Sequence, residues 1–293
     1  LPEEAGIVVR PAVNEELAAT MIAGTQQLDY SPGKRFDGVF SLWYGKGPGL
    51  DRAADAVRHG NAQGAASLGG VVIAVGDDHA AKSSSLACYS DDTVVSLRLP
   101  LFSPSTPREV TLFGLHAFAA SRFSGSWVAL KIINEVADST HTIPADELSQ
   151  TFAVPDQNPG ANVHFKWPVF QLEQEAVQLN HRMPAVHAYA RVNRLDRIVG
   201  KREGATIGLV AAGKTWLDLL EALRLLGLDE DSLAARGILL YKPALIWPLE
   251  PERLAEFSVG LERVIIIEEK TGLIEDQVRA LLYGRQSAPT IEG

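Results

Sequence analysis

Short apolar runs alternate with stretches of helical periodicity along most of the chain, and this alternation limits the fold more than any other feature. From residue 1 to about 135 the order predicts parallel strands joined by helical crossovers. The expected strands are Gly6–Val9, Gly38–Trp43, Gly70–Val75 and Ser126–Ile132, and the expected helices are Glu15–Gln27, Asp51–Gly64 and Pro107–Ser121.

The last third of the chain repeats the alternation after an irregular middle. Residues 141–205 contain many prolines, and within them Leu172–Asn193 is expected to be helical with an interruption at Pro184. We therefore expect an α/β fold of two domains with mainly parallel sheets flanked by helices, at residues 1–140 and 206–293, joined by a linker. In the second domain the expected strands are Thr206–Ala211, Gly237–Tyr241 and Arg263–Glu268, and the expected helices are Lys214–Leu226, Glu250–Val259 and Gly272–Tyr283.

The first expected helix opens with a carboxylate pair. Asn14 is a good N-cap, because its side-chain oxygen can accept a hydrogen bond from a free N–H group of the first turn. Glu15 and Glu16 follow, so that one carboxylate can face solvent while the other turns toward the protein. The alternative is that both acids only complement the helix dipole.

Polar and glycine residues follow three of the expected strands. They are Asn14–Glu15, Tyr44–Gly49 and Gly76–Ser84, and the carboxyl ends of parallel strands meet at one edge of a sheet, where ligands bind. The glycines of Gly45–Gly49 predict either an anion-binding turn or a tight strand-to-helix turn. The last group can hold a carboxylate, a phosphate or another subunit, or it forms a solvated loop.

Gly208–Thr215 matches the literal phosphate-loop pattern of nucleotidases. A phosphate loop must leave its strand after the first glycine, whereas Leu209, Val210 and Ala211 continue the apolar run. We therefore expect these residues to be sheet, and a P-loop nucleotidase stays the alternative from another class. Loss of ATP–magnesium binding in Lys214→Ala would establish it.

Composition excludes several classes of function. The 293 residues carry a net charge of −9 and no cluster of Lys and Arg, which argues against nucleic acid as a partner. No apolar run approaches the roughly 18 residues of a membrane span, and no signal-peptide pattern is present, so a cytoplasmic location is expected. Cys88 is the single cysteine, which excludes an intrachain disulfide and a Cys-rich iron–sulfur site in this chain. His164, His181 and His187 lack metal-ligand spacing, and no metal site is expected.

Six stretches together resemble one known family, in one order along nearly the whole chain. The family is the thiamine-diphosphate-dependent 2-oxoacid:ferredoxin oxidoreductases of the indolepyruvate type. The resemblance implies that residues 1–140 are a pyrimidine-binding domain without its first strand, that residues 206–293 are a transketolase C-terminal-like domain, and that the chain is a piece of something longer. The stretches are Asn14–Thr20, Phe36–Phe40, Trp43–Arg52, Gly76–Ser84, Glu268–Lys270 and Ile274–Gln277.

The resemblance also implies roles and partners. It maps the cofactor-activating glutamate onto Glu15, whose carboxyl group would meet the pyrimidine nitrogen of thiamine diphosphate, and it places Glu268–Glu269–Lys270 at a domain interface. The diphosphate and its Mg²⁺ would lie on a partner subunit or domain, iron–sulfur clusters in a ferredoxin-type partner chain, and the whole in a dimer of assemblies. The expected cofactor contacts are Asn14, Gly45, Lys46 and Gly47, and the expected contacts to substrate or coenzyme are His79, Lys82, Ser83 and Cys88.

The implied reaction is oxidative decarboxylation of an arylpyruvate-like 2-oxoacid to an acyl-coenzyme A. This chain alone would be inactive, because the diphosphate-binding domain is missing. Where the family commonly has histidine, this chain has Cys88. A thiamine-dependent decarboxylase or acyl-transferring synthase without redox chemistry therefore stays an alternative.

Overall fold

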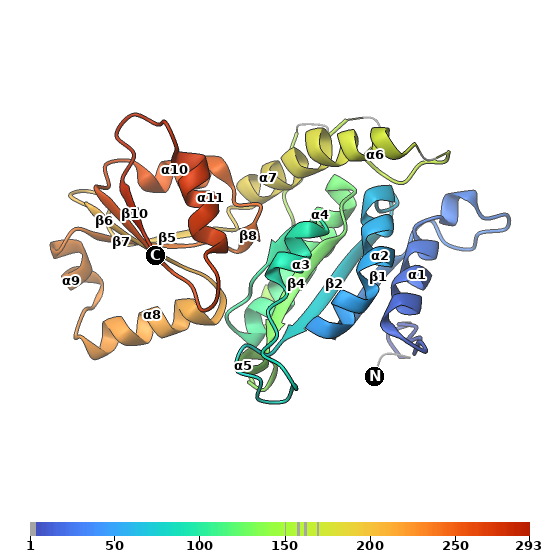
Figure 1. The fold of residues 1–293 in the computed structure, drawn as a ribbon, viewed down its shortest axis with the longest axis horizontal. Helices are drawn as coiled ribbons and strands as arrows, with labels where there is room; N and C mark the ends of the chain where they lie inside the picture. Colours follow the sequence, from blue (N-terminus) through green and yellow to red (C-terminus); the bar gives the residue numbers. More distant parts are fainter. Residues whose placement is uncertain (1–3, 150, 157–158, 161–162, 169) are drawn as a thin grey trace.

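The strands form two five-stranded sheets, which we call sheet A and sheet B. The computed structural model describes residues 4–149, 151–156, 159–160, 163–168 and 170–293. Figure 1 shows the two sheets side by side, with helices packed on both faces of each. Sheet A has the order β1-β2-β4-β3-β8 and sheet B the order β10-β9-β6-β7-β5. The strands are β1 Phe40–Lys46, β2 Gly70–Asp77, β3 Leu101–Phe102, β4 Val128–Ile133, β5 Arg197–Val199, β6 Ile207–Ala211, β7 Ile238–Lys242, β8 Leu245–Trp247, β9 Arg263–Ile267 and β10 Thr290–Glu292.

Each sheet is mainly parallel with one short antiparallel strand at an edge. In sheet A, β1, β2, β4 and β3 run parallel, and β8 pairs antiparallel with β3. In sheet B, only β5 runs antiparallel, against β7. Because β8 comes from the last third of the chain, sheet A is not built from the first 140 residues alone.

Helices cross from strand to strand on both faces. Among the described residues they are α1 Glu15–Thr25, α2 Gly47–Gln63, α3 Asp91–Ser96, α4 Pro107–Ser124, α5 Asn134–Ala137, α6 Gln171–Val177, α7 Met183–Val192, α8 Gly213–Leu225, α9 Glu230–Ala235, α10 Pro251–Ser258 and α11 Leu273–Leu282, with short helical turns at Leu28–Tyr30, Ala145–Leu148 and Gln178–Arg182.

Three apolar clusters explain the layers. The largest joins the α1–α2 face of sheet A, where it includes Trp43, to the α10–α11 face of sheet B, where it includes Val278. A second lies between sheet A and the helices α4 and α7, around Phe102 and Tyr189, and a third lies under α8, around Trp216. The central strands are buried on both faces, which requires the continuous Val and Ile runs seen in the sequence.

The predicted α/β fold of two mainly parallel sheets with flanking helices is confirmed. Two of the elements expected in residues 1–135 were wrong. Gly6–Val9 is not a strand, since Ile7, Val8 and Val9 are exposed and pair with no strand. The second helix, α2, begins at Gly47 and not at Asp51, because it follows β1 without an intervening loop.

The segment between the two sheets is more ordered than its composition suggests. The predicted helix over Leu172–Asn193 is present as α6, a π-helical turn at Gln178–Arg182 and α7, which lie along one side of both sheets (Figure 1). Arg182 is buried there, and its guanidinium group donates to the backbone oxygens of Val163, Asn61, Ala62 and Gln63. Burial lowers the pKa of Arg182 to about 10.

Candidate functional site

The carboxylate pair at the start of α1 lies beside the outer strand of sheet A. The Asn14 side chain accepts a hydrogen bond from the Leu17 N–H at 2.9 Å, as its N-cap position predicts. The Glu15 backbone oxygen accepts from the indole N–H of Trp43, which fixes this turn against β1. The Glu15 carboxylate is 42% exposed, and the nearest cation is Arg52, whose Nε lies 3.9 Å away.

Glycine at position 49 lets the Glu15 side chain pack closely against the start of α2. A Cβ atom at Gly49 would lie 2.9 Å from Glu15 Cγ and 3.3 Å from its Oε1. Any side chain there would push the carboxylate away from the N-terminus of α2. The two helix starts therefore meet at one place, and Glu15 projects from it.

The glycines at 45 and 47 are explained by packing within the chain. A Cβ at Gly45 would lie 2.6 Å from the Trp43 ring, and a Cβ at Gly47 would lie 2.6 Å from Ser90 Oγ. Because β1 ends at Lys46 and α2 begins at Gly47, the tight-turn interpretation describes this segment, and no separate loop encloses an anion.

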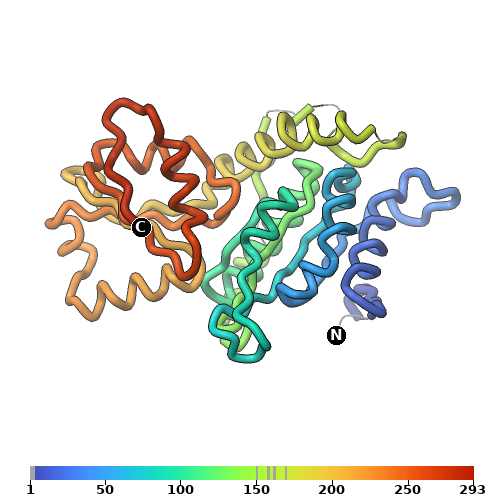
Figure 2. Tube along the Cα trace, viewed as in Figure 1, coloured from blue at the N-terminus to red at the C-terminus, as the bar shows by residue number. Residues whose placement is uncertain are grey.

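The chain between β2 and α3, residues 78–90, forms a loop that we call the β2–α3 loop; Figure 2 shows it in teal, projecting beyond sheet A. The Asp78 carboxylate holds its start by accepting from the N–H groups of Lys82 and Ser83, at 2.8 and 2.7 Å. The hydrogen bond from Ser83 N–H lowers the pKa of Asp78, and the one from Lys82 N–H acts in the same direction. Burial acts to raise this pKa but is outweighed. Lys46 Nζ donates to Ser83 O, Ser83 Oγ and Ser84 Oγ.

Lys46 therefore contacts the loop with all three donors of its ammonium group. Lys82 is exposed and pairs with Asp138 at 3.0 Å.

Cys88 is buried, and its Sγ donates to the Leu86 oxygen at 3.5 Å. Cys88 is thus a packed residue of the loop and is shielded from solvent.

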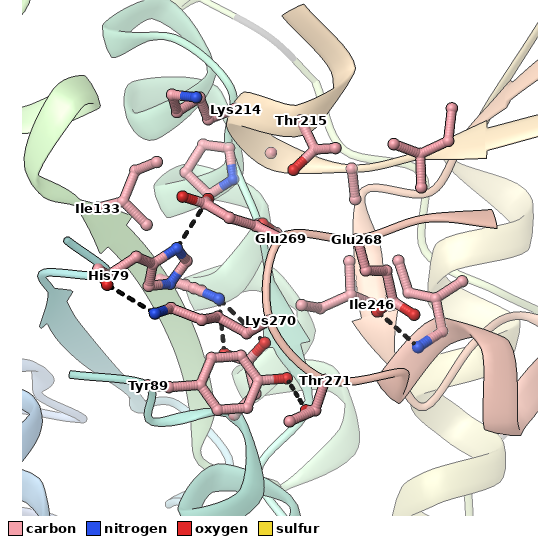
Figure 3. A pocket seen from close by; sticks show the side chains of 18 residues that line it. His79, Tyr89, Ile133, Lys214, Thr215, Ile246, Glu268, Glu269, Lys270 and Thr271 are labelled. Carbon is pink, nitrogen blue, oxygen red and sulfur yellow. Dashed lines mark hydrogen bonds and ion pairs between the residues drawn. The ribbon is translucent and has the colours of Figure 1, made fainter. Parts of the chain in front are cut away.

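A polar pocket lies where the β2–α3 loop meets sheet B (Figure 3). His79 Nδ1 donates to the Glu269 carboxylate at 2.8 Å, while His79 Nε2 is 3.9 Å from Asp77 Oδ2. Lys270 Nζ donates to the His79 backbone oxygen at 2.6 Å. The Thr271 hydroxyl donates to the Tyr89 hydroxyl at 2.7 Å.

Charges in this pocket are paired. Lys131 and Asp91 form a buried ion pair at 2.8 Å, and Lys131 Nζ lies 5.0 Å from the centre of the Tyr89 ring. Burial raises the pKa of Tyr89, so its hydroxyl stays protonated. Burial also raises the pKa of Glu268, whose carboxylate accepts from the N–H groups of Ile274 and Glu275 at the start of α11.

Glu269 differs from its neighbour. Burial acts to raise its pKa, but the hydrogen bond and charge of His79, with Lys214 and Lys131, outweigh burial, and the pKa is lowered. Glu269 is therefore held ionised, as an acceptor for His79.

The predicted site residues fall into two connected groups. Asn14, Glu15, Gly45, Lys46 and Gly47 lie at the starts of α1 and α2, and Lys46 connects them to Ser83. His79 lies at the base of the same loop but faces sheet B. Its contact with Glu269 could not be predicted from the sequence, because the two residues are 190 positions apart in the chain.

The structure contradicts a phosphate loop at Gly208–Thr215. Residues 207–211 are β6, paired with β7 and β9, and α8 begins at Gly213. Lys214 pairs with Asp218 of its own helix at 2.6 Å. No loop is left to enclose a phosphate, which removes the main support for a nucleotidase.

Two kinds of site are absent from the described residues. No group of three or more His, Cys, Asp or Glu side chains in that part of the chain could hold a metal ion. No helix there is both long and apolar enough to cross a membrane.

Known proteins resemble the chain in sequence. The family model described as "Indolepyruvate oxidoreductase domain" matches residues 196–293. The indolepyruvate oxidoreductase subunit IorA of Methanothermobacter marburgensis is 25% identical over 283 residues, and that of Thermococcus kodakarensis is 23% identical over 306 residues. They cover 96% and 99% of this chain, which spans 42% and 43% of their own lengths.

Solved structures show the same fold. The 2-oxoglutarate:ferredoxin oxidoreductase from Magnetococcus marinus, solved with 2-oxoglutarate, coenzyme A and succinyl-CoA bound, superposes with a TM-score of 0.67 over 99% of this chain and 55% of its own, at 14% identity. A split-gene transketolase, an inactive β4 tetramer, gives 0.52 over 96% of this chain and 72% of its own, at 15% identity.

These matches agree with the class that the motifs predicted: the chain is similar in sequence to indolepyruvate oxidoreductase subunits and has the fold of a 2-oxoacid:ferredoxin oxidoreductase. The indolepyruvate type is the description that both the curated relatives and the family model over residues 196–293 carry.

Proposed function

We propose that this chain is the cofactor-activating portion of a thiamine-diphosphate-dependent 2-oxoacid:ferredoxin oxidoreductase subunit. Its substrate would be an arylpyruvate such as indolepyruvate, and its product an acyl-coenzyme A. The observation that carries the proposal is the position of Glu15, which projects from the meeting point of two helix starts beside Gly49.

The residues around Glu15 fit a cofactor ring. A carboxylate that meets a ring nitrogen must be accessible and free of a tight ion pair, and Glu15 satisfies both conditions, since its one cation lies 3.9 Å away and is itself 63% exposed. Val13 and Leu17, which flank it in sequence, are exposed apolar side chains that a flat ring or a second domain can cover. The missing Cβ of Gly49 lets the Glu15 side chain lie against the start of α2.

When bound, thiamine diphosphate with Mg²⁺ supplies the chemistry that breaks the bond between the keto carbon and the carboxylate of a 2-oxoacid. Glu15 holds a proton shared with the pyrimidine nitrogen. Lys82 and Ser83, on the β2–α3 loop, contact the substrate or coenzyme, and Lys46 positions that loop through Ser83. Asn14 fixes the helix turn that carries Glu15.

The remaining parts of the enzyme are supplied outside these 293 residues. The proposal assigns the diphosphate and Mg²⁺ to another domain or subunit, and the iron–sulfur clusters to a chain with the cysteines that this one lacks. The single buried Cys88 cannot replace them. A dimer of such assemblies and a cytoplasmic location are part of the same proposal.

The test uses the full subunit assembled with the chains that copurify with it. In Glu15→Gln we expect exchange of the thiamine C2 proton to slow by about 10²–10⁴-fold, since a positioned acid–base group contributes that much. NMR of the bound cofactor in D₂O measures the exchange. Glu16→Gln is the matched control, because Glu16 is the exposed neighbour in the same helix turn.

Exchange at the wild-type rate in Glu15→Gln would remove Glu15 from cofactor activation. Copurifying chains without Cys-rich motifs would favour the decarboxylase or acyl-transferring synthase that lacks redox chemistry.

A further inference from the structure

Both ends of the β2–α3 loop are bound by one short segment of sheet B. At the start of the loop, Glu269 accepts from His79 Nδ1 and Lys270 donates to the His79 oxygen. At its end, Thr271 donates to Tyr89. These three consecutive residues follow β9, and Figure 3 shows them facing His79 and Tyr89 across the pocket.

The contacts at His79 are partly buried, so they restrain the loop more than fully exposed contacts would. The His79 side chain is 6% exposed and lies between two carboxylates, Glu269 from sheet B and Asp77 from the end of β2. Asp77 is itself fixed by the N–H and hydroxyl of Ser90 at 2.9 and 2.6 Å. The two ends of the loop are therefore tied to each other and to sheet B.

The middle of the loop is held differently. Lys82, Ser83 and Ser84 project to the surface and contact only Asp78, Asp138 and Lys46, all from the part of the chain that builds sheet A. With its ends fixed by residues 269–271, the loop can hold Lys82 and Ser83 in one position, although neither side chain touches sheet B in the contacts described.

We propose that Glu269, Lys270 and Thr271 are positioning residues, through which sheet B sets the position of Lys82 and Ser83 at the substrate or coenzyme site. This inference rests on the proposed function for the role of Lys82 and Ser83. The restraint of the loop does not rest on the proposed function, because it concerns contacts within this chain alone.

The first measurement is hydrogen–deuterium exchange of residues 78–90 in the chain without cofactor. Glu269→Ala removes the acceptor for His79, and we expect exchange in the loop to become at least about tenfold faster. Glu269→Gln keeps an acceptor oxygen and should restore most of the protection. Glu221→Ala is the matched control, because it also removes a carboxylate that accepts hydrogen bonds, but one on α8 that pairs with Arg224 away from the pocket.

The second measurement is steady-state kinetics of the assembled enzyme. We expect Glu269→Ala to raise KM for the 2-oxoacid or coenzyme A by about 2- to 30-fold with a smaller change in kcat, the range that indirect coupling gives. Glu269→Gln should lie near wild type. A purely structural defect would instead lower the amount of active enzyme and leave KM unchanged.

Unchanged exchange in both Glu269→Ala and Thr271→Val would overturn the restraint. Faster exchange with unchanged KM values would overturn the positioning role. In either case the proton-exchange test of Glu15 is unaffected, so failure of this inference and failure of the proposed function are distinguishable.

Discussion

The outer edge of sheet A and the seam between the two sheets are opposites in chemistry. On β1, Phe40, Leu42 and Tyr44 point to one face and are each more than half exposed, and Glu15 lies nearby with one distant cation. In the seam, acids and bases are buried as pairs: Lys131 with Asp91, Lys242 with Glu109, His79 with Glu269.

This difference separates a region whose charges pair within the chain, the seam, from a region that exposes a surface for a second component, the edge of sheet A. The seam pairs its buried charges within the chain, and these pairs fix how the two sheets meet. The edge exposes apolar side chains of the kind that mark an interaction surface, and β1 has an unpaired side. The proposed cofactor site lies at the open edge of sheet A, and the residues proposed to position its loop lie in the seam.

The largest effect on stability is expected from breaking a pair in the seam. Lys242 and Glu109 are both buried. Burial acts to raise the pKa of Glu109, but the charge and hydrogen bond of Lys242, together with hydrogen bonds from Ser105, outweigh burial and lower it. In Lys242→Met the Glu109 carboxylate loses its closest cation, and we expect the free energy of unfolding to fall by about 3–5 kcal/mol. Urea denaturation measures it.

The matched change is Lys214→Met, which breaks an ion pair near the surface and should cost less than about 1 kcal/mol. A similar loss in both variants would show that the seam is no more dependent on its charges than the surface is.

A slightly smaller effect is expected from pH at Asp196. Burial raises the pKa of Asp196 to about 6, although Tyr241 and Ala244 donate to its carboxylate. The folded state thus binds this proton more tightly than the unfolded state. Its contribution to stability is full below the unfolded pKa and is lost as the pH rises through the folded one, by about 2.4 kcal/mol between pH 4 and 7.

The difference in stability between wild type and Asp196→Asn isolates this contribution. His116, whose pKa burial lowers to about 4, gives the opposite slope and cancels in the difference. A difference that stays constant between pH 4 and 7 would refute the buried-acid interpretation.

The smallest effect on folding is expected at the open edge. Leu42→Ser and Tyr44→Ser change exposed side chains and should alter the unfolding free energy by less than about 0.5 kcal/mol. If a second component covers β1, the same changes should weaken its binding by at least about tenfold. Leu225→Ser, on exposed α8 of sheet B, is the control, and equal binding in all three variants would leave the edge without a partner.

The sequence predicted the parts of the fold that repeat a pattern over several residues. Runs such as Gly70–Val75 and Arg263–Glu268 identified β2 and β9, because strands buried on both faces must be continuously apolar. Strands of two or three residues, β3, β5, β8 and β10, were missed because they are too short to show a period. Gly6–Val9 has the composition of a strand but no neighbour to pair with.

The candidate site was predictable only in part. The N-cap at Asn14 and the strand ends of β1 and β2 are local signals, and they located Glu15, Lys46 and His79 in the sequence. The reason for Gly47, which is the closeness of Ser90, depends on a contact between segments far apart in the chain. The same holds for the burial of Cys88.

By itself, the sequence determined the longer strands and helices, the cap that presents Glu15 and the family that the chain resembles. Those properties depend on hydrogen bonds and periodicities within a few residues. Only the tertiary structure decided that β8 returns to sheet A, that His79 faces Glu269 and that the edge at β1 stays open. Each of these depends on which distant groups can bury or pair with one another, and that is a property of packing in three dimensions.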